Sequence, residues 1–155
     1  MIDIKSAFLQ GQALDRDVVI KPPREAETDE VWCLKKCLYE LKDASRKWYN
    51  IVKQTMIDLG CMVSKTDPTV FIFKENGCVS GILGTHVDDF LFGGNGNFET
   101  KIIGKMCDKF SVGKHESDDF TYTGFKLIQK KDRIVQDQID YVSKLQVESM
   151  MVDRL

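Results

Sequence analysis

The chain has 155 residues, of which 43% are hydrophobic and 30% charged, and its formal net charge is −2. This length suits one globular domain, and this composition excludes an intrinsically disordered chain. No apolar run approaches the ~20 residues that span a bilayer, and no secretory signal precedes the first motif, so we expect no membrane association. The five cysteines lack the spacing of a disulfide framework, which predicts reduced thiols in an intracellular protein, cytoplasmic or nuclear.

The N-terminal segment places Asp3 directly after an apolar residue and an aromatic residue, Phe8, five positions later. Residues 12–30 contain two adjacent prolines and a charged run, which is typical of an exposed connection. A short strand is predicted over Val31–Leu34. Cys33 and Cys37 lie four positions apart, but no second Cys or His pair completes a zinc site, so we interpret them as structural thiols.

Basic residues crowd into a stretch of thirteen residues that is opposed by only two acidic residues, Glu40 and Asp43. A solvated helix face and a phosphate-contacting surface explain this cluster equally well. The net charge of −2 is unusual for a nucleic-acid enzyme, which normally carries a basic surface. The basic residues of the cluster are Lys35, Lys36, Lys42, Arg46 and Lys47.

Apolar residues recur at helical spacing from Asp43 to Leu59, and Gly60 is the expected end of this helix. The segments Val70–Phe73 and Val79–Val87 flank Asn76-Gly77, the strongest two-residue hairpin signal. Phe90–Phe92 is predicted to return antiparallel beside Val79–Val87.

Asp88 and Asp89 lie between these last two apolar runs, so both carboxylates are predicted at the tip of a strand–turn–strand hairpin. Carboxylates gathered at a tip suit magnesium, a hard cation that takes oxygen ligands and is usually shared with substrate phosphates. The alternative is an Asp-rich turn without chemistry, because Asp is common in turns.

The remaining sequence predicts a second amphipathic helix from Phe98 to Phe110, a hairpin from Phe120–Gln129 and Arg133–Val135, and a helix over about 138–150. Together these elements predict an α+β fold, an antiparallel sheet with two or three packed helices, in a single domain over residues 1–155. We expect the aromatic residues to lie mainly in the core. They are Trp48, Tyr49, Phe71, Phe73 and Phe110.

Three blocks in this order resemble the reverse transcriptase of copia-type retrotransposons. They are Asp-Ile-Lys-Ser-Ala-Phe-Leu from Asp3, Leu-Tyr-Glu-Leu-Lys-Asp-Ala-Ser-Arg-Lys-Trp from Leu38, and His-Val-Asp-Asp from His86. Further matches at Ser64–Phe71, Tyr122–Gly124 and Gln136–Tyr141 extend the resemblance over essentially the whole chain. The resemblance implies a polymerase palm-like fold.

The resemblance also implies an RNA-directed DNA polymerase that joins a primer hydroxyl to a deoxynucleotide by two-metal nucleotidyl transfer. Its catalytic and metal-binding carboxylates match Asp3 and Asp88, with Asp89 as the third member, and its cofactors are two magnesium or manganese ions. Of the adjacent pair, Asp88 is the expected direct ligand.

Phe8 matches the residue that packs beneath the sugar and excludes a 2′-hydroxyl, although a plain core position is an alternative. Lys42 and Arg46 match the block that borders the nucleotide and the template, so they are expected to bind nucleotide. His86 stands where the family has Tyr, close to the primer end, with a purely structural histidine as the alternative.

Glu40 replaces a family glycine, a residue that allows a positive φ, and adds a negative charge near the expected phosphate path. The chain starts two residues before Asp3. We therefore expect a palm-type domain truncated at both ends, without fingers or thumb and inactive alone. Completed by an upstream segment, it would act on an RNA or DNA template-primer and deoxynucleotide triphosphates. The alternatives are a non-catalytic nucleic-acid-binding or interaction remnant, and the product of a decayed element with no function.

Overall fold

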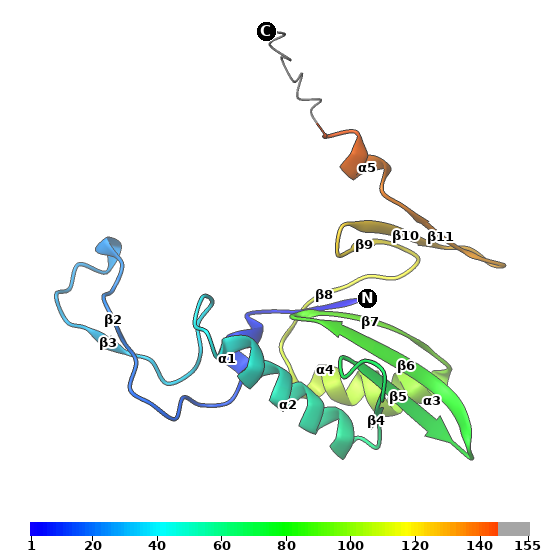
Figure 1. Ribbon diagram of the computed structural model, residues 1–155, viewed down its shortest axis with the longest axis horizontal. Helices are drawn as coiled ribbons and strands as arrows, with labels where there is room; N and C mark the ends of the chain where they lie inside the picture. Colours follow the sequence, from blue (N-terminus) through cyan, green and yellow to red (C-terminus); the bar gives the residue numbers. More distant parts are fainter. Residues whose placement is uncertain (146–155) are drawn as a thin grey trace, which may run out of the picture. The chain divides into compact units, whose positions relative to one another are not determined.

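The computed structural model describes residues 1–145, and the chain divides into two compact units, Met1–His115 and Glu116–Leu155. The first unit contains a six-stranded sheet, a two-stranded sheet and the main helices, and the second contains a three-stranded sheet (Figure 1). Every strand pairing is antiparallel. The predicted α+β fold is therefore confirmed, whereas a single palm-type domain over residues 1–155 stays a prediction.

The six-stranded sheet has the order β4-β5-β6-β7-β1-β8. The N-terminal strand β1 thus lies between β7 and β8, beside the hairpin that carries the paired aspartates. The sequence did not predict β4 or β8. The bounds of the six strands are β1 (Ile2–Ile4), β4 (Met62–Val63), β5 (Val70–Glu75), β6 (Cys78–His86), β7 (Asp89–Gly94) and β8 (Val112–His115).

Helix α2 (Ala44–Asp58) follows the predicted bounds, and it ends in a Schellman motif. Gly60 has φ 90°, its N–H donates to the carbonyl of Ile57, and the N–H of Cys61 donates to the carbonyl of Met56. The second predicted helix is also present, in three parts. They are α3 (Gly96–Phe98), a π-helical segment (Glu99–Gly104) and α4 (Lys105–Lys109), while a short helix α1 (Ala7–Gln10) was not predicted.

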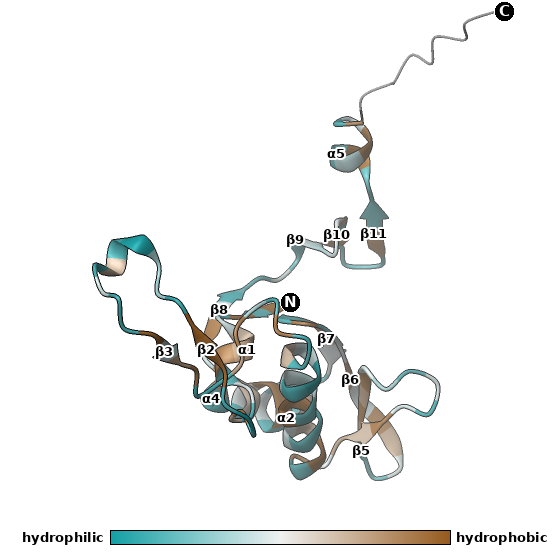
Figure 2. Cartoon of the chain, turned by 60° about the vertical axis from the view of Figure 1, so that its left-hand side comes forward, coloured by the Kyte–Doolittle hydropathy of each residue, from teal (hydrophilic) through white to brown (hydrophobic). Residues whose placement is uncertain are grey.

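The core lies between the sheet and these helices, and Figure 2 shows the apolar side of α2 turned inward. Trp48 is its central residue, with ring centroids 5.0 Å from Phe110 and 6.5 Å from Phe90. Of the aromatic residues expected in the core, Trp48, Phe71, Phe73 and Phe110 are buried, and Tyr49 packs at its edge.

Phe98 fixes the start of the second helix on the sheet. Its ring rests on Gly81 and Gly94, which are cross-strand partners on β6 and β7. A Cβ on either glycine would overlap this ring, closer than 3.0 Å. The two glycines are therefore needed for the close approach of helix and sheet, not for their backbone conformation.

The predicted β5–β6 hairpin turns at Asn76 and Gly77, whose φ values of 51° and 80° are those of a type I′ turn. The predicted tip of the next hairpin is wrong by one residue. Val87 and Asp88 form the turn, while Asp89 begins β7 and pairs with His86. Asp89 also pairs with Asp3, and this second pairing holds it in the sheet.

The second unit holds β9 (Asp119–Tyr122), β10 (Phe125–Gln129), β11 (Ile134–Asp137) and α5 (Ile139–Val142). The strand predicted over Phe120–Gln129 is wrong, because Thr123 and Gly124 adopt φ 48° and 86° and reverse the chain. The last helix begins near the predicted position but ends at Val142, so its predicted continuation over residues 143–145 is wrong. The predicted part from residue 146 lies outside the described residues.

The predicted exposed connection contains β2 (Val19–Ile20) and a 3₁₀ turn (Arg24–Ala26), and β2 pairs with β3 (Trp32–Cys33). This two-stranded sheet forms no strand pairing with the six-stranded sheet within the described residues, and Figure 1 shows it to the left of that sheet. Within residues 1–145, none of the helices combines the length and apolar character that a membrane crossing requires.

Glu75 joins the β5–β6 hairpin to the second helix, so its charge should matter at low pH. Its carboxylate accepts from Lys101 (2.5 Å), Ser80 (3.1 Å) and Asn97 (3.2 Å), and Lys101 chiefly lowers the pKa of Glu75. A carboxyl group with a lowered folded-state pKa stabilises the fold above its unfolded pKa of 4.5 and loses this contribution as pH falls below that value.

Glu75→Gln should therefore flatten the loss of stability as the pH falls below about 4.5. Urea denaturation at a series of pH values measures this effect. Glu99→Gln is the control, because the Glu99 side chain has no partner among the described residues. Equal pH profiles for the wild type and Glu75→Gln would contradict the assignment.

Candidate active site

A row of polar residues crosses four strands of the large sheet. His86 pairs with Asp89, Asp89 pairs with Asp3, and Asp3 pairs with Lys114. Directly opposed residues of antiparallel strands point to the same face, with Cβ atoms about 4.5–5.5 Å apart. The sequence neighbours Ile2, Ile4 and Phe90 are buried under the helices, so the row lies on the opposite face. Asp3 and Asp89 are therefore adjacent carboxylates on the helix-free face.

Asp88 lies next to this row, at the hairpin tip. Its backbone carbonyl accepts from the N–H of Ile4 (2.8 Å), and its carboxylate accepts from the Tyr39 hydroxyl (3.4 Å). Desolvation of that hydroxyl raises the pKa of Tyr39, and the carboxylates of Asp88 and Asp3 raise it further. Ile4 directly follows Asp3, and Asp3 pairs with Asp89, so the backbone contact from Ile4 brings Asp3 and Asp88 into one neighbourhood.

Tyr39 is the residue of this site that the sequence reasoning missed. Its ring packs on Phe8, with centroids 4.6 Å apart and planes inclined by 55°. Phe8 is buried in the core, whereas Tyr39 keeps 53% of its surface exposed. Tyr39 therefore covers the predicted sugar-contacting ring and reaches Asp88 at the same time. The signal that could have identified Tyr39 is its position close to Glu40 and Lys42, in the second of the three blocks that resemble the family.

The turn that carries Asp88 is strained. Val87 has φ 55°, a region that β-branched residues rarely adopt. A positive φ at the first central residue alone is the pattern of a type II′ turn, which favours glycine there. The indole N–H of Trp48 donates to the carbonyl of Val87 at 2.6 Å. The central residue of the core thus holds this turn in place.

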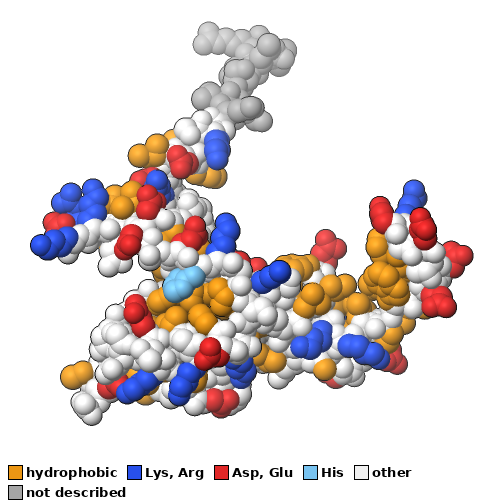
Figure 3. Space-filling model, turned by 180° about the vertical axis from the view of Figure 1, so that it is seen from behind, with side chains coloured by type: hydrophobic (Ala, Val, Ile, Leu, Met, Phe, Trp, Pro, Cys, Tyr) orange, Lys and Arg blue, Asp and Glu red, His pale blue; other side chains and the backbone are white. Residues whose placement is uncertain are grey.

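One residue of the basic cluster, Lys47, forms an ion pair, and Asp43, which opposes the cluster, pairs with an arginine outside it. Lys47 pairs with Asp15 (3.2 Å) and lowers its pKa, and Arg16 pairs with Asp43 (2.8 Å) and lowers the pKa of that carboxyl group. Seen from behind, acidic and basic side chains are interspersed around hydrophobic ones (Figure 3). No field of one charge sign covers that side.

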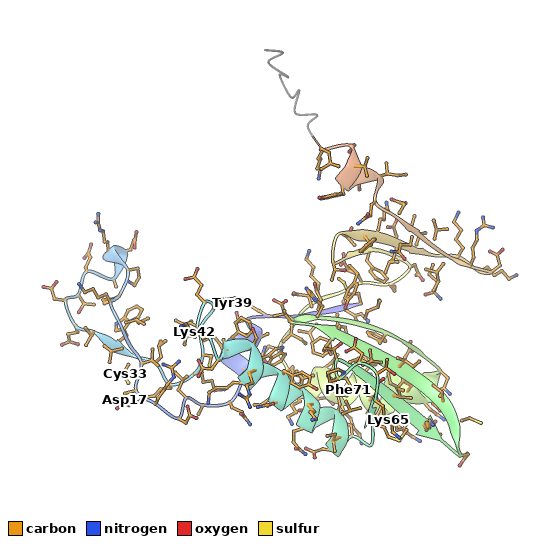
Figure 4. The ribbon with its side chains drawn as sticks, viewed as in Figure 1. Asp17, Cys33, Tyr39, Lys42, Lys65 and Phe71 are labelled. Carbon is orange, nitrogen blue, oxygen red and sulfur yellow. The ribbon has the colours of Figure 1, made fainter. Side chains whose placement is uncertain are left out.

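Lys42 and Arg46 are exposed and have no ion-pair partner among residues 1–145. Figure 4 shows Lys42 and Tyr39 on the same loop, which leads into α2. A basic side chain thus lies a few residues from the one that contacts Asp88. The nucleotide-binding role predicted for Lys42 and Arg46, and the primer-proximal role predicted for His86, stay predictions.

Glu40 has φ 72°, the left-handed conformation that glycine adopts without cost. The loop therefore keeps the backbone geometry expected of the family glycine although the residue has changed. Its carboxylate also has no ion-pair partner in the described part of the chain, unlike that of Asp43.

No group of three or more His, Cys, Asp and Glu side chains in residues 1–145 is arranged to hold a metal ion by itself. Magnesium in sites of this kind binds through one or two carboxylates and takes its other ligands from water and substrate phosphates. Asp3 and Asp88, two carboxylates in one neighbourhood, fit a cation that is shared with a substrate better than an all-protein site.

The family model for reverse transcriptase (RNA-dependent DNA polymerase) matches residues 1–154. The chain belongs to this family.

Among its curated relatives are copia-type Pol polyproteins. The retrovirus-related Pol polyprotein from transposon RE2 of Arabidopsis thaliana is 31% identical over 74% of the chain and 8% of the relative. The polyprotein from transposon TNT 1-94 of Nicotiana tabacum is 31% identical over 72% of the chain and 9% of the relative. The transposon Ty1-GR1 Gag-Pol polyprotein of Saccharomyces cerevisiae is 30% identical over 68% of the chain and 6% of the relative. The chain thus spans less than a tenth of these relatives. No solved structure matches it significantly.

Trp48→Phe should destabilise the protein, because phenylalanine keeps a core ring but cannot donate to Val87. The lost hydrogen bond predicts a cost of about 1 kcal/mol or more, measured by urea denaturation followed by circular dichroism. Trp32→Phe is the matched control, since Trp32 is 44% exposed and should be nearly neutral. Equal costs for both variants would argue against a special role of the Trp48 hydrogen bond.

Glu40→Gly should stabilise the protein by about 1 kcal/mol, because a left-handed conformation costs an L-residue roughly that amount. The control is Glu30→Gly, at an exposed position whose φ is not positive, where glycine should bring no gain. Thermal denaturation of the three proteins compares them directly. A loss of stability in Glu40→Gly would show that the Glu40 side chain makes a contribution larger than its backbone strain.

Proposed function

We propose that this chain supplies the catalytic carboxylates of an RNA-directed DNA polymerase that works by two-metal nucleotidyl transfer on a palm-like fold. The observation that carries the proposal is the pairing of Asp3 with Asp89 in the sheet, with Asp88 held beside them by the hydrogen bond from the Ile4 N–H to its carbonyl. Family membership supports the reaction class.

In this proposal Asp3 and Asp88 hold the cations, with Asp89 as the third carboxylate. Two magnesium or manganese ions would lower the pKa of the attacking primer hydroxyl and stabilise the leaving pyrophosphate. The chain's own residues position the substrates. Phe8 takes the sugar and excludes a 2′-hydroxyl once Tyr39 moves off its ring, and Lys42 and Arg46 bind the phosphates or the template strand. His86, at the end of the polar row, contacts the primer end.

The isolated chain is proposed to bind cations without extending a primer. In-line positioning of primer and triphosphate accounts for about 7–11 kcal/mol of a barrier of this type. The relatives that match are polyproteins of which the chain spans 6–9%, so positioning groups from other segments are part of the proposal. The unpaired charge of Glu40 next to Lys42 further weakens the hold on phosphates.

A primer-extension assay with purified chain, an RNA template, a DNA primer, deoxynucleotide triphosphates and magnesium tests the proposal. We expect no extension by the chain alone and template-dependent extension when a longer segment of the same polyprotein is supplied. Asp88→Asn should abolish the restored activity, by about 10²-fold or more, because a metal-binding carboxylate is lost.

Extension by the isolated chain that depends on Asp88 would keep the catalytic assignment and overturn the proposed inactivity. Restored extension that is insensitive to both Asp3→Asn and Asp88→Asn would overturn the catalytic assignment itself. Salt-dependent binding of single-stranded RNA through Lys42 and Arg46, with no restored activity, would favour the nucleic-acid-binding remnant instead.

A further inference from the structure

A β-bulge in β8 faces the aspartate of β1. Ile4 pairs with Val112 and Asp3 pairs with Lys114, so Gly113 is the extra residue between these pairs. In a bulge of this kind two residues of one strand oppose a single residue of its partner. Gly113 and Lys114 therefore both lie opposite Asp3.

The Asp3 carboxylate fills the space above Gly113. A Cβ on Gly113 would lie closer than 3.0 Å to Asp3 Oδ2 and 3.5 Å from its Cγ, and real Cβ atoms essentially never show contacts below 3.0 Å. The φ of Gly113 is outside the left-handed region, so its backbone would accept an L-residue. Space for the carboxylate, and not backbone freedom, is the physical reason for a glycine here.

The residue after Asp3, Ile4, donates its N–H to the backbone carbonyl of Asp88 at 2.8 Å on the other side of β1. Because β1 lies between β7 and β8, a carboxylate that leans over Gly113 also turns away from Asp89 on β7. Turning away reduces the repulsion between two directly opposed like charges.

We propose that Gly113 is a positioning residue: the bulge and the missing side chain fix the direction in which Asp3 presents its carboxylate to a cation. This inference rests on the proposed function of Asp3 and Asp88. Bulges occur next to active sites where they re-aim a side chain, and groups that orient metal ligands typically change metal affinity 10–100-fold.

Titration of the full chain with Mn²⁺, followed by the electron paramagnetic resonance signal of the free ion, tests the proposal. Gly113→Ala should weaken Mn²⁺ binding about 10–100-fold. Gly93→Ala should leave it unchanged, because a Cβ on Gly93, in the same sheet, meets nothing within 4 Å. Unchanged affinity in Gly113→Ala would overturn the proposal. Tighter Mn²⁺ binding by Gly113→Ala would also overturn the proposal. It would mean that the Asp3 carboxylate has to leave its position over Gly113 in order to bind the ion.

A stability cycle provides a readout without metal. Alanine is more favourable than glycine in a strand, so Gly113→Ala should raise the urea midpoint clearly in an Asp3→Ala background. In the wild-type background this gain should be reduced or reversed, because the carboxylate must move. Equal shifts in both backgrounds would mean that Gly113 and Asp3 are not coupled and would overturn the inference.

The two experiments separate the inference from the function on which it rests. If the wild type and Asp3→Asn bind Mn²⁺ equally weakly, the cation site of the proposed function fails, while the cycle still reports whether Gly113 sets the carboxylate. If the wild type binds and Asp3→Asn does not, the cation site holds, and the affinity of Gly113→Ala alone decides the role of Gly113.

Discussion

The hydrogen bond from the Trp48 indole to the Val87 carbonyl is the contact on which the site depends. One side of the indole packs in the core between Phe90 and Phe110, and its N–H holds the strained turn beside Asp88. The packing of α2 in the core therefore also positions the turn that carries Asp88. Since the acceptor is a backbone atom, the contact does not depend on the side chain at position 87. The stabilisation that this hydrogen bond brings offsets part of the strain of a valine at a position where glycine is favoured.

Local patterns in the sequence were sufficient to predict much of the architecture. Helical spacing gave α2, and Gly60 ended it, because a glycine in the left-handed conformation completes the Schellman motif. Asn76-Gly77 predicted a two-residue hairpin for a similar reason, because both residues tolerate a positive φ. These features depend on residues close together in the chain. The error over Phe120–Gln129 arose because Thr123, an unusual residue at positive φ, precedes the glycine of that turn.

The site itself was predicted only by residue type. The sequence pointed to Asp3 and Asp88, but the register that sets Asp3 opposite Asp89 follows from pairing between strands far apart in the chain. The one-residue error at the hairpin tip has the same origin, because β1 recruits Asp89 into the sheet. Tyr39 and Gly113 were missed since each acts through a contact with a distant residue, Asp88 and Asp3 respectively.

The π-helical segment within the second helix has a consequence for how this region can change in length. A π-helical turn holds one residue more than the α-helical turn that it replaces, so removing a residue from Glu99–Gly104 would restore regular α-helical hydrogen bonding. If all six residues instead became α-helical, Phe98 would rotate by about 100° relative to Met106, because the chain would turn by the angle of one additional α-helical residue. Phe98 would then leave its seat on Gly81 and Gly94. The irregular segment thus acts as a spacer that keeps two parts of one helix facing the sheet, and a more regular helix would fit this protein less well.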